Sequence, residues 1–148
     1  MKISTKVECG IIALIDIAVN SRDGGIVKVA SISERNNISA KYLEQILPLL
    51  RQARIINSVK GASGGYTLSK GASEISLNEI VNALDNTILS SASFSDKLEK
   101  NAILAVEECL WSPVTEFLQK FTSDLTLKEL ADNYSERQVS KPELMYYI

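Results

Sequence analysis

Histidine is absent from this 148-residue sequence, and it has only two cysteines, three prolines and one tryptophan. Without histidine there can be no Ser-His-Asp triad and no histidine-ligated zinc site. We also find no phosphate-binding glycine loop and no pair of carboxylates in a recognisable catalytic motif. The sequence therefore argues against an enzyme.

The two cysteines, Cys9 and Cys109, are too few and too far apart for a disulfide framework. A free cysteine is most often a small buried apolar residue, and this is the simplest interpretation of Cys9. Cys109 lies beside a predicted helical stripe, where an intersubunit disulfide or a redox-sensing thiol is an alternative. Both residues are therefore weak candidates for redox chemistry.

Long apolar runs are also missing. No stretch approaches the length of apolar chain that spans a membrane, and the first ten residues, MKISTKVECG, lack the apolar core of a signal peptide. We therefore expect a cytoplasmic protein with no membrane partner. The length predicts one domain, or one domain with an appendage.

Charge is unevenly distributed between the two halves of the sequence. Residues 1–70 hold ten Lys and Arg against five Asp and Glu, whereas residues 71–148 hold six against thirteen. This pattern favours a DNA-binding head joined to a separate regulatory body. Ordinary scatter of surface charge is the alternative.

The N-terminal half has the pattern of a helix-turn-helix. Apolar residues at helical spacing predict a helix over 4–20, and IVKV at 26–29 is a candidate strand. Two further helices, over 29–37 and from Ser39 to 55, are separated by about three residues. This is the spacing of a helix-turn-helix motif.

Two β-rich segments follow, over 54–59 and 65–68, joined by the glycine-rich sequence KGASGG. Glycines in such a loop permit positive φ angles and close approach to another surface. The sequence therefore predicts a mainly α fold with a small β-hairpin, in which a winged helix-turn-helix head is followed by a long dimerisation helix.

The C-terminal half is predicted to be helical. A helix over 74–86 with Ser76 as its N-cap precedes a serine-rich loop over 87–97, and a closing helix over 124–136 has Asp124 as its expected cap. Between them, apolar residues recur at spacings of three and four: Ile103, Val106, Leu110, Val114, Phe117 and Phe121.

This stripe predicts packing against a partner helix, most simply that of a second copy. The alternative is a helix packed across its own head. Pro113 lies within the stripe, so we expect a kink or break there. The predicted organisation is a DNA-binding domain over 1–86, dimerisation and regulatory helices over 87–136, and a tail over 137–148.

Three segments together resemble the Rrf-two superfamily of bacterial winged-helix regulators: STK near the start, SISERNNISAKYLEQILPLLR at 31–51, and SVKGASGGYTLSK at 58–70. The resemblance implies a homodimer that binds palindromic double-stranded DNA. One helix would enter the major groove and the wing an adjacent minor groove. The matching positions are Ser39, Lys41, Tyr42, Glu44 and Gln45 on the helix, and Lys60, Gly61, Ala62 and Ser63 on the wing.

The chemistry of these residues suits that role. Gln45 can pair with adenine and Glu44 can accept from cytosine, whereas Lys41 and Lys60 can neutralise phosphates. Ser39 as a cap would leave helix N-terminal amides available to a phosphate. The alternative for Tyr42 is packing in the core.

The sequence departs from the family pattern in two places. Arg54 stands where the family usually has glycine, so it must avoid or tolerate a left-handed conformation. Ala62 and Ser63 stand where the wing usually has a third glycine or a Tyr/Pro pair, which is a mild change.

Members of the family that bind an iron–sulfur cluster use three cysteines before the long helix, where this sequence has none, and Glu108 stands at the position of a histidine ligand. Such a cluster needs about four soft ligands. We therefore expect no cofactor and no metal. The resemblance is strongest to the cluster-free, CymR-like repressors of cysteine and sulfur metabolism.

The last residues, Tyr146, Tyr147 and Ile148, resemble the tail of that group. By analogy with serine acetyltransferase tails that enter the active site of cysteine synthase, they are a candidate site for that enzyme. The alternative is a tail packed on the dimer. Two other hypotheses stay open: a thiol-based redox regulator, and a dimeric adaptor that has lost DNA binding.

Overall fold

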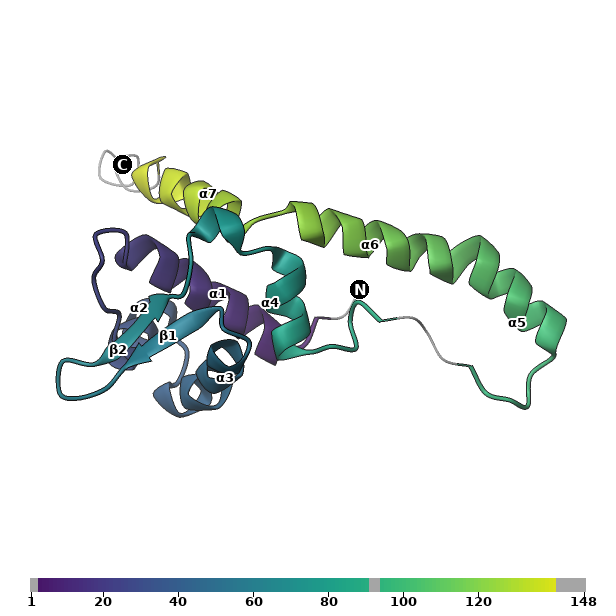
Figure 1. Cartoon of the computed structure of the whole chain (residues 1–148), viewed down its shortest axis with the longest axis horizontal. Helices are drawn as coiled ribbons and strands as arrows, with labels where there is room; N and C mark the ends of the chain where they lie inside the picture. The colour runs from purple at the N-terminus through teal and green to yellow at the C-terminus, as the bar shows by residue number, and fades with distance from the viewer. Residues whose placement is uncertain (1–2, 91–93, 141–148) are drawn as a thin grey trace, which may run out of the picture.

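A computed structural model describes residues 3–90 and 94–140 of the chain. The structure consists of a head and an arm (Figure 1). The head contains four helices, a hairpin and a short 3₁₀ helix, which are α1 (Thr5–Asn20), α2 (Val29–Asn36), α3 (Ala40–Gln52), β1 (Ile56–Val59), β2 (Gly65–Leu68), η1 (Ala72–Glu74) and α4 (Leu77–Leu84). The arm consists of α5 (Lys100–Val106), the π-helical turn η2 (Glu107–Trp111) and α6 (Ser112–Asp124). The last helix, α7 (Leu127–Ser140), packs against α1.

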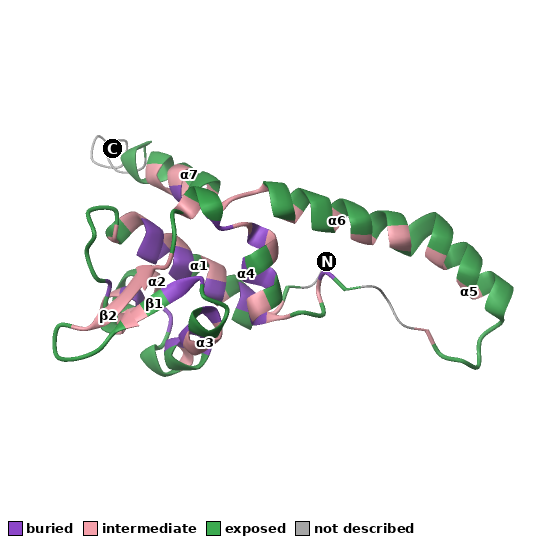
Figure 2. Cartoon of the chain, viewed as in Figure 1, coloured by how far each residue is buried: buried purple, intermediate pink, exposed green. Residues whose placement is uncertain are grey.

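Buried side chains are concentrated in the head, as Figure 2 shows. Helix α3 buries one face because its apolar residues recur every three or four positions. Each of its four buried residues is at most 1% exposed: Leu43, Ile46, Leu47 and Leu50. Helices α1, α2 and α4 pack against α3, and the core of the head is completed by Ile56 of β1 and by Leu127 and Ala131 of α7.

The helix-turn-helix is confirmed, and the residues that shape its turn are visible. Asn37 ends α2 in the left-handed region with a φ of 55°, a conformation that asparagine tolerates better than most residues. Ser39 then caps α3, because its hydroxyl accepts from the backbone N–H of Tyr42 at 3.1 Å. The turn therefore has a defined geometry at both ends.

The hairpin is antiparallel, and its register pairs Ile56 with Leu68 and Val59 with Gly65. The predicted strand over 26–29 is wrong. Only Val27 pairs there, exchanging backbone hydrogen bonds with Tyr66 at 2.9 and 2.8 Å. The following residues have entered α2 by Val29, so no extended segment is long enough to form a third strand.

Arg54 adopts a φ of 60° between α3 and β1, so it tolerates the left-handed conformation rather than avoiding it. Its N–H donates to the Arg51 carbonyl at 2.9 Å. The Ser69 hydroxyl donates to the Arg54 carbonyl. These contacts offset the cost of a non-glycine residue at this position.

The arm does not break at Pro113. The helix widens into η2 immediately before it, and Pro113 occupies the first turn of α6. Proline has no N–H and its ring crowds the carbonyl four residues earlier, and a π-helical turn relieves both problems. The helix therefore continues through Pro113 without a break, and the irregularity expected there takes the form of a π-helical turn.

The closing helix also differs from its prediction. Its cap is Thr126 rather than Asp124, which still belongs to α6. The Glu129 N–H donates to the Thr126 hydroxyl at 3.3 Å, and the Glu129 carboxylate accepts from the Thr126 N–H at 2.9 Å. This is a capping box, which satisfies two backbone donors at once.

Helix α7 continues to Ser140, past the predicted end at residue 136. Leu127 and Ala131 are buried in the core of the head. The predicted division of the chain at residues 86 and 136 remains a prediction, but α7 packs with the head.

Over residues 3–90 and 94–140, no helix has the length and apolar character needed to cross a bilayer.

Candidate nucleic-acid interface

The N-terminal half of α3 presents three polar side chains on one exposed surface. Lys41, Glu44 and Gln45 are all exposed, and the apolar face of the same helix is held in the core. Because helical residues three and four apart share a face, Lys41 lies beside both Glu44 and Gln45. The predicted helix residues are therefore brought together in a position where they can reach a ligand.

Tyr42 differs from these neighbours. It is half-buried and packs against the core of the head. Its ring packs on the core and part of its surface is accessible, so both DNA contact and core packing stay predictions for Tyr42. We regard Lys41, Glu44 and Gln45 as better candidates for base or phosphate contacts.

The loop between β1 and β2 contains the predicted wing residues, and Lys60, Gly61, Ala62 and Ser63 are all exposed. Figure 1 shows this loop projecting from the head on the side away from the arm. Gly61 has a φ of 105°, a conformation that L-residues rarely adopt. Gly64 closes the turn by donating to the Gly61 carbonyl at 2.9 Å.

Gly64 and Gly65 are required for a different reason. A Cβ at Gly64 would lie 2.1 Å from the Val59 carbonyl oxygen, and one at Gly65 would lie 2.4 Å from that of Val27. Both distances are far inside van der Waals contact. Glycine is therefore needed where three backbone segments meet at the base of the loop.

An ion pair that sequence reasoning missed joins the buried Asp16 of α1 to Arg35 of α2, whose side chain is 42% exposed. Asp16 is 5% exposed and accepts from Arg35 through both carboxylate oxygens, at 2.9 and 2.7 Å. Asn36 donates to the same carboxylate at 2.8 Å. The hydrogen bonds and charge of Asp16 raise the pKa of Arg35, so this guanidinium stays charged.

The contacts of Asp16 determine the position of the turn between α2 and α3. Asn36 is the last residue of α2, and the turn into α3 follows directly, so the carboxylate fixes the segment that orients the exposed face of α3. The only signal in the sequence is an acid within the apolar run IIALIDIAV. Nothing local identifies its partner nineteen residues later.

The apolar stripe of the arm faces solvent in the single chain. Five of its six residues are between 41% and 68% exposed and the sixth is half-buried: Val106, Leu110, Val114, Phe117, Phe121 and Ile103. The rings of Phe117 and Phe121 stack with centroids 6.1 Å apart.

A different side of α6 contacts the head. Thr122 accepts from Asn78 at 3.2 Å, and Leu118 packs against the core. The alternative of a stripe packed across its own head therefore does not describe this structure, because the stripe points elsewhere.

Both cysteines lie among the described residues, and both are free thiols. Cys9 is half-buried against the core, and partial burial, followed by the charge of Glu8, raises the pKa of its thiol. A raised pKa makes it a poor nucleophile at neutral pH. Cys109 is exposed on η2. Tyr146, Tyr147 and Ile148 lie outside the described residues.

Comparison with known proteins identifies the family. A model of the Rrf2 family, described as iron-dependent transcriptional regulator, matches residues 3–133. The chain belongs to the Rrf2 family. It is 34% identical over 140 residues to the HTH-type transcriptional regulator IscR of Escherichia coli O1:K1, a match that covers 95% of this chain and 86% of that protein.

Solved structures of the Rrf2 family agree. CymR (YrzC), the global cysteine regulator of B. subtilis, matches with a TM-score of 0.75 and 29% identity, over 90% of this chain and 98% of that one. The oxidised form of CymR from Staphylococcus aureus matches with a TM-score of 0.70 and 34% identity, over 88% and 96%. These relatives are transcriptional regulators and not enzymes, and their winged-helix fold is the fold of this chain.

Iron is part of the family's description, but the donor set of this Rrf2 chain does not fit an iron–sulfur cluster. The full sequence offers two thiols and no imidazole, against about four soft ligands needed. Within the described ranges, no group of three or more His, Cys, Asp or Glu residues is placed to hold a metal ion. Near the start of the arm, Phe94 and Leu98 instead line an apolar cavity with Ala102 and Ile103.

Proposed function

We propose that this Rrf2-family chain is a homodimeric, cluster-free repressor that binds a palindromic operator. Its α3 would lie in a major groove and its β1–β2 loop along an adjacent minor groove. The observation that supports this best is the division of α3 into a fully buried apolar face and an exposed face bearing Lys41, Glu44 and Gln45. A helix held in this way can present amide and carboxylate groups to base edges.

Electrostatics are consistent with this arrangement. The chain has a net charge of −2, yet residues 1–70 hold twice as many basic as acidic residues. Those residues form the helix-turn-helix and the wing, so the positive charge is on the half that would meet phosphate. Because phosphate contacts release counterions, affinity should fall steeply with salt.

Dimerisation is supported by the arm. None of the residues of α5, η2 and α6, all of which the structure describes, is buried, although the arm displays a continuous apolar stripe. Contiguous exposed apolar surface on a small protein marks an interaction site. A second copy would cover stripe with stripe and hold two heads at a fixed spacing, as a palindromic site requires.

DNA binding is tested by fluorescence anisotropy with a palindrome selected from random duplexes, at 50 and 200 mM salt. We expect Gln45→Ala to weaken binding to the selected site about tenfold or more, and Lys60→Ala to weaken all duplexes and reduce the salt slope by about one. The matched controls are Gln52→Ala, at the exposed C-terminal end of α3, and Lys97→Ala, before the arm. A wild-type protein that binds no duplex at low salt would instead support the adaptor hypothesis.

Control of cysteine or sulfur genes is the finer part of the proposal. Its support is the likeness to the CymR structures and the absence of ligands for a cluster. The chain is also 34% identical to regulators named IscR, so the control of cysteine or sulfur genes has to be tested directly. Sequencing of genomic fragments that the purified protein retains should show enrichment upstream of cysteine and sulfur genes, and enrichment elsewhere would contradict this assignment.

The cysteine synthase hypothesis rests on the sequence of the tail alone. A pull-down with full-length protein and with a variant lacking Tyr146–Ile148 tests it. We expect the enzyme to be retained only by the full-length protein, and equal retention or no retention would remove the hypothesis.

The alternative function is regulation through oxidation of a thiol. The raised pKa of Cys9 makes it the less reactive of the two thiols, so the exposed Cys109 is the better candidate for the redox-sensing residue. DNA affinity before and after mild peroxide, compared between wild type and Cys109→Ser, distinguishes the two mechanisms. If the protein is a cluster-free repressor without a redox-sensing thiol, peroxide should leave the DNA affinity of both proteins unchanged.

A further inference from the structure

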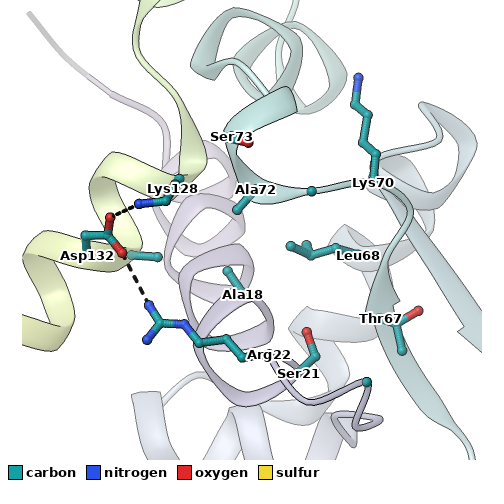
Figure 3. A pocket seen from close by; sticks show the side chains of 13 residues that line it. Ala18, Ser21, Arg22, Thr67, Leu68, Lys70, Ala72, Ser73, Lys128 and Asp132 are labelled. Atoms are coloured by element: carbon teal, nitrogen blue, oxygen red, sulfur yellow. Dashed lines mark hydrogen bonds and ion pairs between the residues drawn. The ribbon is translucent and has the colours of Figure 1, made fainter.

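A cavity of about 700 Å³ lies between α1, β2, η1 and α7, away from α3 and the wing loop (Figure 3). Its walls come from both ends of the chain, so it exists only because α7 packs against α1. The volume is within the range of small-molecule sites in proteins, about 300–1,000 Å³.

The lining combines an apolar wall with a charged rim. Small apolar side chains form the wall: Ala18, Leu68, Ala72 and Ala131. The lining also has three cations, Arg22, Lys70 and Lys128, and three hydroxyl-bearing residues, Ser21, Thr67 and Ser73. Such a lining suits a small molecule with one apolar end and one polar end.

Most of the charged groups in the lining are cationic. Asp132 pairs with both Arg22 and Lys128, and Lys70 pairs with Glu79 at 2.9 Å. Three lining residues are cations and only Asp132 is an acid, while the Glu79 and Glu74 carboxylates lie beside Lys70 and Gly71 just outside the lining. Figure 3 shows Arg22, in the turn after α1, and Lys128, on α7, both pointing to Asp132.

Arg22 is the group best placed to bind an anion. Its hydrogen bonds to Asp132 and Ser135 are both 3.4 Å long and both use one terminal nitrogen, Nη2. Within the described part of the chain, Nε and Nη1 have no acceptor. The pair with Asp132 is half-exposed on both sides, so it is weak and a ligand carboxylate can displace or share it.

We propose that this cavity binds a small organic monoanion, a carboxylate or sulfonate with an apolar portion. The anionic group contacts Arg22 and Lys128, and the apolar portion lies on the alanine-rich wall. The ligand joins α7 to β2, which leads out of the wing loop, and this position couples the site to the DNA-binding surface. That coupling rests on the proposed function, whereas ligand binding does not.

The binding test uses the full chain and the fluorescent aryl sulfonate 1-anilinonaphthalene-8-sulfonate. We expect one saturable site per chain, weakened at least fivefold by Arg22→Gln and at least tenfold by Ala72→Phe, which fills the cavity. Benzoate should displace the probe, whereas inorganic phosphate at the same concentration should not. Lys120→Gln is the matched control, because Lys120, like Arg22, is an exposed cation paired with an aspartate but lies on α6, away from the cavity.

Circular dichroism should show native helicity for each variant, and a second filling variant, Ser73→Leu, replaces Ala72→Phe if that variant fails to fold. Unchanged probe binding in Arg22→Gln and in a folded filling variant would overturn the proposal. So would loss of binding in Phe117→Ser/Phe121→Ser, because the probe would then lie on the arm.

The coupling is measured as DNA affinity with and without saturating benzoate. We expect a change of at least threefold that Arg22→Gln abolishes. An unchanged affinity overturns the coupling, and a protein that binds benzoate but no DNA overturns the proposed function while the cavity site stands.

Discussion

The head and the arm of this molecule differ in where their apolar side chains lie. The head, together with Leu127 of α7, has twelve large side chains that are less than 2% exposed, whereas all of the large apolar residues of the stripe from Val106 to Phe121 are more than 40% exposed. Figure 2 makes the contrast visible: buried residues fill the head, and none occur in the arm. The head is thus stabilised by its own packing, while the arm presents apolar surface that the single chain leaves uncovered.

The largest effect is expected for substitutions in the apolar stripe of the arm. Replacing Phe117 and Phe121 with serine should weaken dimerisation about a thousandfold, about 4 kcal/mol, because each dimer loses four phenyl rings. Sedimentation equilibrium measures the change. Lys120→Ala on the same helix should leave the dissociation constant unchanged, and a double serine variant that is still fully dimeric would place the interface elsewhere.

The same type of change in the head should act on folding instead. Leu47→Ala removes a side chain with 0% exposure from the centre of the core. We expect the free energy of unfolding to fall by about 3 kcal/mol. Urea denaturation measures this, and Leu104→Ala, at 62% exposure on the arm, is the matched control with an expected loss under about 0.5 kcal/mol.

The buried carboxylate of Asp16 provides the next test. Arg35→Ala should destabilise the head by about 2 kcal/mol, below the usual cost of a broken buried pair, because the Arg35 side chain is itself 42% exposed and Asn36 still donates to the carboxylate. DNA affinity should fall as well, since the start of α3 is less well positioned. Arg22→Ala, which breaks an exposed pair, should cost under about 1 kcal/mol.

The cap of α7 tests how firmly this helix is joined to the head. Thr126→Ala removes one half of a capping box and should lower stability by about 1 kcal/mol. Asp124→Ala should have almost no effect, because Asp124 is the last residue of α6 and does not cap α7. Thermal unfolding of the two variants distinguishes the two caps. A larger loss of stability in Asp124→Ala than in Thr126→Ala would support Asp124 as the cap of α7.

The smallest effect is a pH dependence at the start of α4. Burial acts to raise the pKa of Glu79, but the hydrogen bonds from Ser76 and Lys70 and the charge of Lys70 outweigh it, so the pKa lies below its ordinary value of 4.5. A carboxylate with a lowered pKa in the folded state stabilises the protein above the unfolded value and loses that contribution as the pH falls through the folded value. The difference in unfolding free energy between wild type and Glu79→Gln, under about 0.5 kcal/mol, should therefore be constant above pH 5.5 and shrink below about pH 4.5. A difference that grows in acid would contradict the assignment.

Much of the head could be predicted because its signals are local. The apolar spacing of α1, α3 and α4 indicates helices, and Ser39 and Ser76 are caps in the structure as expected. The glycines of the wing loop were expected to relieve backbone constraints, and they do so by two different means, positive φ at Gly61 and close backbone approach at Gly64 and Gly65.

The sequence-based predictions were wrong where several local conformations were equally compatible with the sequence, or where the residue that decides the conformation lies far away in the sequence. Asp124 and Thr126 are both good capping residues, and only the path of the chain between α6 and α7 selects one of them. Pro113 permits a break or a continuous irregular helix, and the arm continues through it by way of a π-helical turn. Val27 has strand propensity, but its pairing ends after one residue because α2 begins at Val29.

The amino-acid sequence by itself determined the helix-turn-helix, the glycine wing and an apolar stripe along the arm, since each depends on residue spacing within a short segment. Tertiary structure alone decided that Asp16 would pair with Arg35, that α7 would pack along α1, and that a cationic cavity would open between α7 and β2. The physical reason is that propensity, capping and periodicity act over a few residues, whereas burial and charge pairing depend on segments that only folding brings together.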